Sequence, residues 1–141
     1  TMPTPENEKK IKYLSRYIPA SRSIDRLLEE QYRWKCLAIK VTSTLSPVPG
    51  GGESGSPIER PMDKVDELEK EINREIDELV KIREEIEAVL GQLEDRNLRD
   101  LMKYRYIDGL TWEQVAEKMH YGREWTCRLH GKALLKITIS H

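Results

Sequence analysis

Apolar residues recur at helical spacing over almost the whole chain. Between residues 24 and 45 they return every three or four positions, which predicts one apolar stripe along a helix of roughly 20 residues. Pro19 and Ser21 stand just before this stretch as plausible entry signals. The residues 8–18 are expected to form a shorter helix.

The same stepping returns downstream and continues for more than four turns. It predicts a long helix over residues 62–94, with charged side chains at the remaining positions. An isolated helix with one apolar stripe is unstable in water, so this helix needs a partner. The helix over 24–45 is the nearest candidate, and the two can fold back as an antiparallel hairpin. Such hairpins often self-associate, so we expect a homodimer or a higher homo-oligomer.

A segment rich in Pro, Gly and Ser separates these two helices. The residues 46–61, "SPVPGGGESGSPIERP", lose the apolar periodicity. Such a composition does not bury enough surface to offset the entropy of ordering, so we expect a flexible connector. The predicted organisation is a helical hairpin over 6–96 and a second module over 97–141.

The C-terminal part predicts two short helices joined by a tight turn. Thr111 and Gln114 have the spacing of a capping box, so a helix begins at "WEQVAEKM". "HYG" makes the turn, and "REWTCRLHGKALLKI" begins the next helix. A helix over 98–107, closed by Asp108 and Gly109, precedes them. The inward residues of the last helix are Leu129, Ala133, Leu134 and Ile137. This pattern is a helix-turn-helix, in which the first helix braces the second.

Composition supports an all-α protein, and the charges are unevenly shared. Of 141 residues, 35% are charged and none is Phe. The residues 62–96 hold 13 acidic and 6 basic side chains, a net charge of −7, while 97–141 hold 5 acidic and 8 basic, a net charge of +3. If one face of the molecule meets DNA, it belongs to the C-terminal module. No apolar run has the length of a membrane span, and we expect a protein of the bacterial cytoplasm.

The C-terminal module resembles region 4 of the sigma-70 class of bacterial sigma factors. The resemblance covers residues 98–137 and is carried by "YRYIDGLTWEQVAEKM", by "GRE" after the turn and by "KALLKI". With the charged helices before it, the chain is also similar in outline to phage and prophage regulators of Gram-positive bacteria, of the ArpU and RinA kind. The resemblance implies a module that reads double-stranded DNA in the major groove.

The resemblance places a set of residues toward DNA. Arginine pairs with guanine or clamps phosphate, and glutamate accepts from cytosine. Lys132 is either a phosphate contact or a compensating charge near the helix end. The sequence departs from the family pattern at Thr126, His120 and Gly131. The expected DNA-facing residues are Gly122, Arg123, Glu124, Trp125 and Arg128.

Catalysis and metal binding are not expected. His120 and His130 have no partner at metal-ligand spacing, and Cys36 and Cys127 lie outside any paired motif. No cofactor is indicated. Trp112 is expected to pack, with Tyr104 and Tyr106 covering the core and Arg105 pointing outward as a weak phosphate candidate.

Three functions remain open from the sequence. The first is a sequence-specific phage or prophage transcription regulator that reads DNA and contacts RNA polymerase. The second is a DNA-recognition subunit of a packaging machine, similar to a small terminase, which would assemble as a ring. The third is a protein-interaction module that binds polymerase and not DNA.

Overall fold

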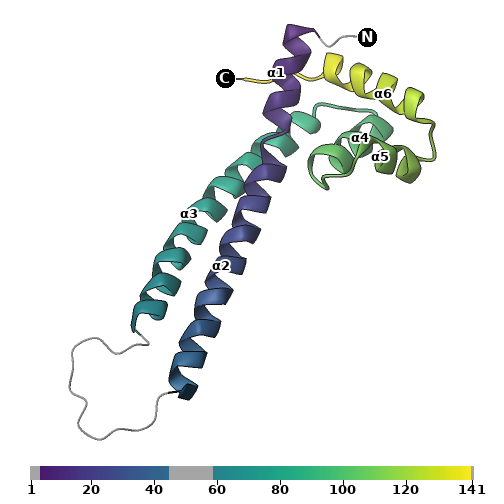
Figure 1. Ribbon diagram of the computed structural model, residues 1–141. Helices are drawn as coiled ribbons and strands as arrows, with labels where there is room; N and C mark the ends of the chain where they lie inside the picture. The colour runs from purple at the N-terminus through teal and green to yellow at the C-terminus, as the bar shows by residue number, and fades with distance from the viewer. Residues whose placement is uncertain (1–3, 45–58, 141) are drawn as a thin grey trace, which may run out of the picture. The chain divides into compact units, whose positions relative to one another are not determined.

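The computed structural model describes residues 4–44 and 59–140, and within them it has six α-helices and no strand (Figure 1). The predicted all-α class is confirmed. The described chain forms two compact units, the first from residues 4–21 and 79–140 and the second from Arg22–Glu78. The helices are α1 (Pro5–Leu14), α2 (Tyr17–Thr44), α3 (Glu59–Leu90), α4 (Arg96–Tyr106), α5 (Trp112–Met119) and α6 (Arg123–Lys136).

Three predicted helices have other bounds in the structure. The short helix expected over 8–18 is α1, Pro5–Leu14, and residues 17 and 18 belong to the next helix. The second helix begins at Tyr17, seven residues before the predicted apolar stripe, and Pro19 lies inside its first turn. Proline is tolerated there because the amide groups of a first turn have no intrahelical acceptor. The long helix runs over Glu59–Leu90 and not over 62–94. Its start takes in the last three residues of the predicted connector, and the rest of that connector lies outside the described residues.

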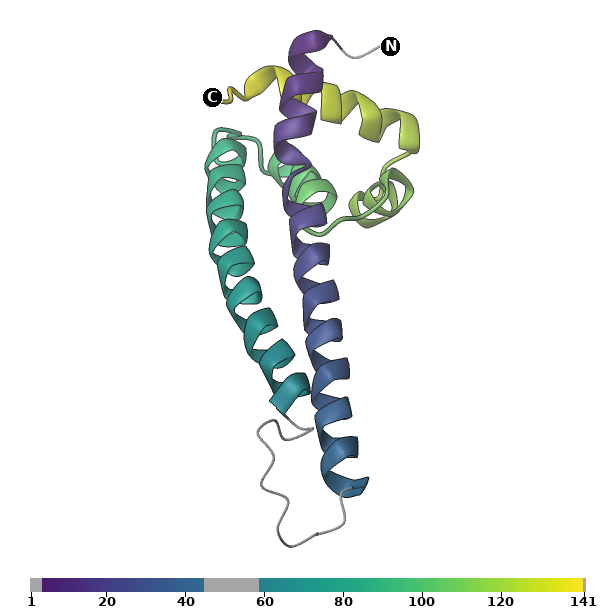
Figure 2. The same ribbon diagram turned by 60° about the vertical axis from the view of Figure 1, so that its left-hand side comes forward.

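The second unit is an antiparallel pair formed by α2 and α3, so the predicted hairpin is confirmed (Figure 2). The buried Gln31 joins the two helices within this unit. Its amide nitrogen donates to the Val65 carbonyl at 3.2 Å and to the Glu69 carboxylate at 2.6 Å. These bonds satisfy the buried amide. Among the described residues of this unit, the buried apolar side chains are Ile24, Ala38, Pro61, Val65 and Ile72.

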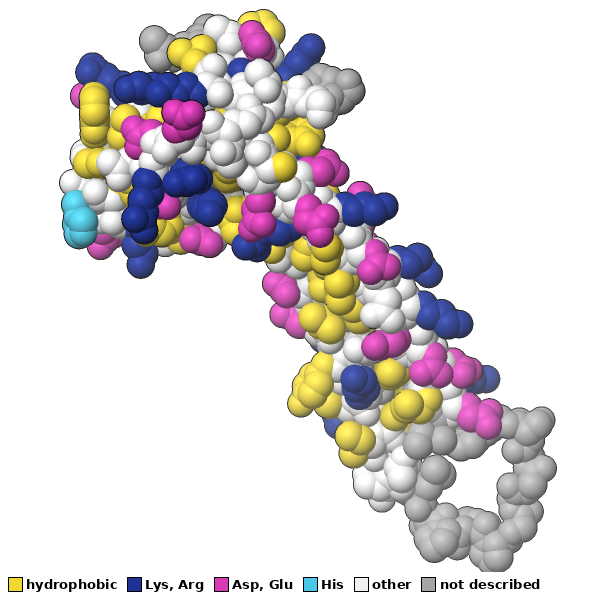
Figure 3. All heavy atoms as spheres, turned by 180° about the vertical axis from the view of Figure 1, so that it is seen from behind, with side chains coloured by type: hydrophobic (Ala, Val, Ile, Leu, Met, Phe, Trp, Pro, Cys, Tyr) yellow, Lys and Arg dark blue, Asp and Glu magenta, His cyan; other side chains and the backbone are white. Residues whose placement is uncertain are grey.

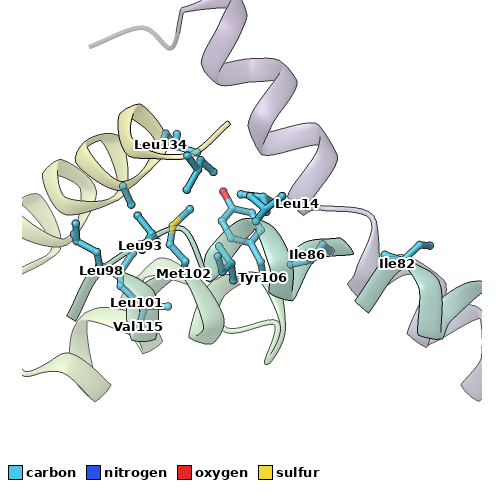
Figure 4. Close-up of a cluster of buried hydrophobic side chains, with 14 residues drawn as sticks. Leu14, Ile82, Ile86, Leu93, Leu98, Leu101, Met102, Tyr106, Val115 and Leu134 are labelled. Carbon is cyan, nitrogen blue, oxygen red and sulfur yellow. The ribbon is translucent and has the colours of Figure 1, made fainter. Parts of the chain in front are cut away.

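The first unit has a larger core, to which the predicted helix-turn-helix is only one contributor. Figure 4 shows its side chains converging from α1 and α3 as well as from the three C-terminal helices. Leu14 of α1 and Ile86 of α3 are fully buried in it, beside Leu101 of α4. The core therefore extends beyond the three helices that the sequence predicted. The predicted division into 6–96 and 97–141 concerns sequence modules and stays a prediction.

Two polar contacts hold the end of α6 in place. The Lys10 ammonium of α1 is buried and donates to the Leu134 carbonyl at 2.8 Å, where the last turn of α6 leaves carbonyl groups unpaired. The Gln92 side chain donates to the Thr138 carbonyl at 2.8 Å and accepts from the Thr138 amide at 2.9 Å. Both contacts join α6 to segments far away in the sequence.

No helix in the described ranges combines the length and the apolar character that a membrane crossing requires.

We expect Lys10→Met to lower the free energy of unfolding by about 1–2 kcal/mol, because it removes a hydrogen bond from a charged donor at a helix C-terminus and keeps the aliphatic stem. Chemical denaturation followed by circular dichroism measures the change. The matched control is Lys9→Met, because Lys9 is the residue before Lys10 in the same helix and is exposed. Equal stability of the two variants would show that the contact with Leu134 does not stabilise the fold.

Candidate nucleic-acid interface

The turn between α5 and α6 is built from local hydrogen bonds. At the start of α5, the helix before the turn, the predicted capping box is confirmed: Thr111 Oγ1 accepts from the Gln114 amide at 3.2 Å, and Gln114 Oε1 accepts from the Thr111 amide at 2.9 Å. At the other end of α5, His120 takes the left-handed conformation with φ 62°. The Tyr121 amide then donates to the Ala116 carbonyl at 3.0 Å. This closure ends α5 after eight residues.

The first turn of α6 explains one of the departures from the family pattern. Thr126 is fully buried, and its hydroxyl donates to the Gly122 carbonyl at 2.8 Å, so the hydroxyl is satisfied where an apolar side chain was expected. Gly122 is the N-cap, with an ordinary φ of −72° and no side-chain cap. Gly131 has open space around the position of a Cβ atom, so no close packing requires a glycine there.

All the residues expected to face DNA are exposed. The buried side of α6 carries Thr126, Ala133 and Leu134, and the helix turns its other side to solvent. Arg123 and Arg128 have side chains that are 69% and 70% exposed. Figure 3 shows lysine and arginine side chains gathered over the first unit. The exposed residues of the expected set are Gly122, Arg123, Glu124, Trp125, Arg128 and Lys132.

Each exposed arginine has an acidic neighbour. The Arg123 guanidinium lies 3.2 Å from the carboxylate of Glu113 on α5, and Arg128 lies 3.5 Å from Glu124, one turn earlier on α6. Exposed ion pairs of this kind contribute little to the free energy of folding, and salt screens them. Both guanidinium groups are therefore available to a phosphate or a base. Glu113 was missed by the sequence analysis because it is ten positions away from Arg123, and only the turn brings them together.

A cluster of aromatic and polar side chains fixes the middle of α6. The Tyr106 hydroxyl and His130 Nε2 share a hydrogen bond of 2.7 Å, and the ring of Trp112 lies 4.4 Å from that of His130. The Arg105 guanidinium stacks over Trp112 at 4.9 Å and donates to the Leu110 carbonyl at 2.9 Å. The expectation of an outward Arg105 is therefore wrong, whereas the packing role of Trp112 and the core position of Tyr106 are confirmed.

Burial sets the charge state of this cluster. Burial, together with the nearby Arg105 charge, lowers the pKa of His130 to about 4. Burial also raises the pKa of Tyr106 to about 12. Near neutral pH both groups are uncharged, so α4, α5 and α6 meet without a buried charge.

Within the described residues, no group of His, Cys, Asp and Glu side chains is arranged to hold a metal ion. Cys36 and Cys127 are both free thiols.

Comparison with known protein families gives a match over residues 89–138 to the model described as Sigma-70, region 4. The match supports a helix-turn-helix of the region 4 kind and a DNA-binding, transcription-related function. It begins before the predicted limit of residue 98, so it includes Leu90 and Leu93, which the structure buries in the same core. Neither a curated protein nor a solved structure shows significant similarity to the chain.

We expect the stability of the first unit to fall as the pH falls from about 6.5 to about 4. In this window the unfolded chain protonates its histidine, whereas folded His130 stays neutral, so the unfolded state binds more protons. The effect of this one group amounts to at most about 3 kcal/mol. Urea unfolding at a series of pH values measures it. His130→Gln should flatten the pH dependence, whereas His120→Asn, at an exposed position, should retain it. If both variants keep the same slope, His130 is not the group that titrates.

Proposed function

We propose that the chain is a transcription regulator of phage or prophage origin, in which the N-terminal half of α6 reads a specific DNA sequence in the major groove. The observation that carries the proposal is that Arg123, at the start of α6, and Arg128, on its outward side, are both exposed within a helix-turn-helix of the region 4 kind. A recognition helix makes its base contacts with N-terminal residues of this type. The phage origin and the contact with RNA polymerase rest on the resemblance seen in the sequence.

The roles of the individual residues follow from their chemistry. Arg123 and Arg128 present planar guanidinium groups that can bind guanine at two points. Glu124 can accept from cytosine once DNA draws Arg128 away from it. Lys132 lies about two turns after Glu124 on α6 and is suited to a phosphate contact. The proposal assigns no catalytic role and no cofactor to the chain.

An exposed leucine gives weight to the protein-interaction alternative. Leu135 is 76% exposed and lies seven residues after Arg128, which places both on one side of α6. Exposed apolar residues among polar ones often mark a protein contact. If this side of α6 binds protein and not DNA, binding should depend little on salt, because no phosphate contacts release counterions.

The proposal is tested by selecting bound fragments from a random DNA pool and then measuring affinity for the selected site and for unrelated DNA. Enrichment of one motif is expected. A lack of enrichment, with binding to polymerase that resists salt and survives loss of Arg123 and Arg128, would favour the protein-interaction function.

We expect Arg123→Ala to weaken binding to the selected site by about 1–3 kcal/mol and to relax the base preference, because a bidentate base contact is lost. Lys132→Ala should weaken binding to all sequences alike and reduce the salt dependence by about one counterion. Fluorescence anisotropy over a series of salt concentrations measures both effects. Lys70→Ala on α3 is the control, because it removes the same charge from the second unit and should leave the affinity unchanged. Equal losses on every sequence for Arg123→Ala and Lys132→Ala would contradict base reading by Arg123.

A further inference from the structure

The hairpin of the second unit exposes a row of large apolar side chains. Tyr32 and Ile39 of α2 are each 68% exposed, although both belong to a helix that already buries an apolar stripe. Leu28 on α2 and Met62 and Ile76 on α3 are between 40% and 45% exposed. We call these five residues the open face. Figure 3 shows apolar side chains exposed along this unit.

The five residues of the open face lie on one side of the hairpin. Successive residues of an α-helix are about 100° apart, so Leu28, Tyr32 and Ile39 fall about 60–100° from the inward direction of Gln31. On α3, the side chains of Met62 and Ile76 are rotated about the helix axis by a similar angle, and in the same sense, from the direction of the buried Ile72. In an antiparallel pair of helices, residues rotated from the inward direction by equal angles in the same sense lie on the same side of the pair. A hollow lined by Ala38, Ile39 and Thr42 of α2 together with Met62 of α3 agrees with this placement.

Each helix therefore has the pattern of a helix in a four-helix bundle. A helix in a two-helix pair buries one narrow stripe, whereas a helix in a four-helix bundle contacts two neighbours and needs apolar residues over a wider arc. The second unit alone has a thin core. Twenty residues of helix are about 30 Å long, so two helices side by side present a face on the order of 600 Å², close to the roughly 800 Å² that each partner of a stable complex buries.

The charges of the two helices indicate which partner covers the open face. The residues 22–44 hold 5 basic and 3 acidic side chains, a net charge of +2, whereas 59–78 hold 4 basic and 9 acidic, a net charge of −5. A second copy of the same hairpin offers an acidic helix to the basic α2 and a basic helix to the acidic α3. The favourable arrangement sets α2 of one copy against α3 of the other and keeps the two acidic helices apart, diagonally across the bundle.

We propose that the open face is covered by a second copy of this chain, so that two hairpins form a four-helix bundle with α2 packed against α3 of the partner. A two-fold axis parallel to the helices generates this arrangement, and it makes every pair of neighbouring helices antiparallel. Both copies of α2 then enter the bundle at the same end. The proposal is independent of whether α6 reads DNA.

The mass of the full chain in solution tests the assembly. Sedimentation equilibrium over a series of micromolar concentrations should give twice the 16.5 kDa of the chain. A monomer at every concentration would overturn the proposal, whether the connector, another protein or solvent covers the face. A ring of eight or more copies would also overturn it and favour the packaging alternative.

Matched substitutions test the face. Ile39→Glu should weaken the dimer by at least about a hundredfold, because a charge is buried without a partner. Leu37→Glu is the control, because Leu37 is 43% exposed on the opposite side of α2 and should leave the dimer intact. Circular dichroism of both variants shows that the hairpin still folds. A dimer that survives Ile39→Glu, or that is lost equally with Leu37→Glu, would place the interface elsewhere.

Cross-linking tests the pairing of the helices. In a background of Cys36→Ser and Cys127→Ser, chains with Ile39→Cys are mixed with chains with Met62→Cys and oxidised. The mixed disulfide should dominate, since the two positions lie at similar heights on α2 and α3. Disulfides formed mainly between two Ile39→Cys chains would show that α2 packs against α2, which would overturn the proposed arrangement.

Discussion

The division of α6 into a buried side and an exposed side is the constraint on which the candidate interface depends. Thr126, Ala133 and Leu134 are removed from water against the core of the first unit, and this burial fixes the rotation of the helix about its own axis. Once that rotation is fixed, Arg128 faces solvent, whereas Arg123 is exposed because it is the first residue of the helix and lies beyond the core. A rotation by one residue position, about 100°, would bury charge and expose the core.

The position of α6 along its axis has a separate origin. Apolar packing allows a helix some freedom to slide, whereas hydrogen bonds between fixed partners do not. The bond between Tyr106 and His130 fixes the middle of α6 and Lys10 holds its end, whereas the bond from the Thr126 hydroxyl to the Gly122 carbonyl lies within the helix and moves with it. Two of these three contacts come from outside the turn and its two helices. The helix-turn-helix of this chain is thus held in place by α1 and α4.

The second unit follows a different physical rule. Its two helices bury few apolar residues and join through the bonds of Gln31, while Tyr32 and Ile39 remain in water. A polar residue in a helix interface favours one register over others at some expense in stability. Such a hairpin is suited to further association, because its exposed side chains and its unequal charges have complements in a second copy of itself.

The sequence by itself determined the elements and much of the candidate site. Apolar periodicity predicted the hairpin, the capping box predicted the start of α5, and the outward residues of α6 were predicted from the turn and the resemblance. These features are local, because they depend on residues within about two helical turns of one another. The tertiary structure alone decided the contacts between distant segments. No spacing rule joins Arg123 to Glu113, Lys10 to Leu134 or Arg105 to Trp112, because each pair meets only when separate helices pack. Packing also decided that Thr126 is buried, although the bond from its hydroxyl to the Gly122 carbonyl is local to the helix.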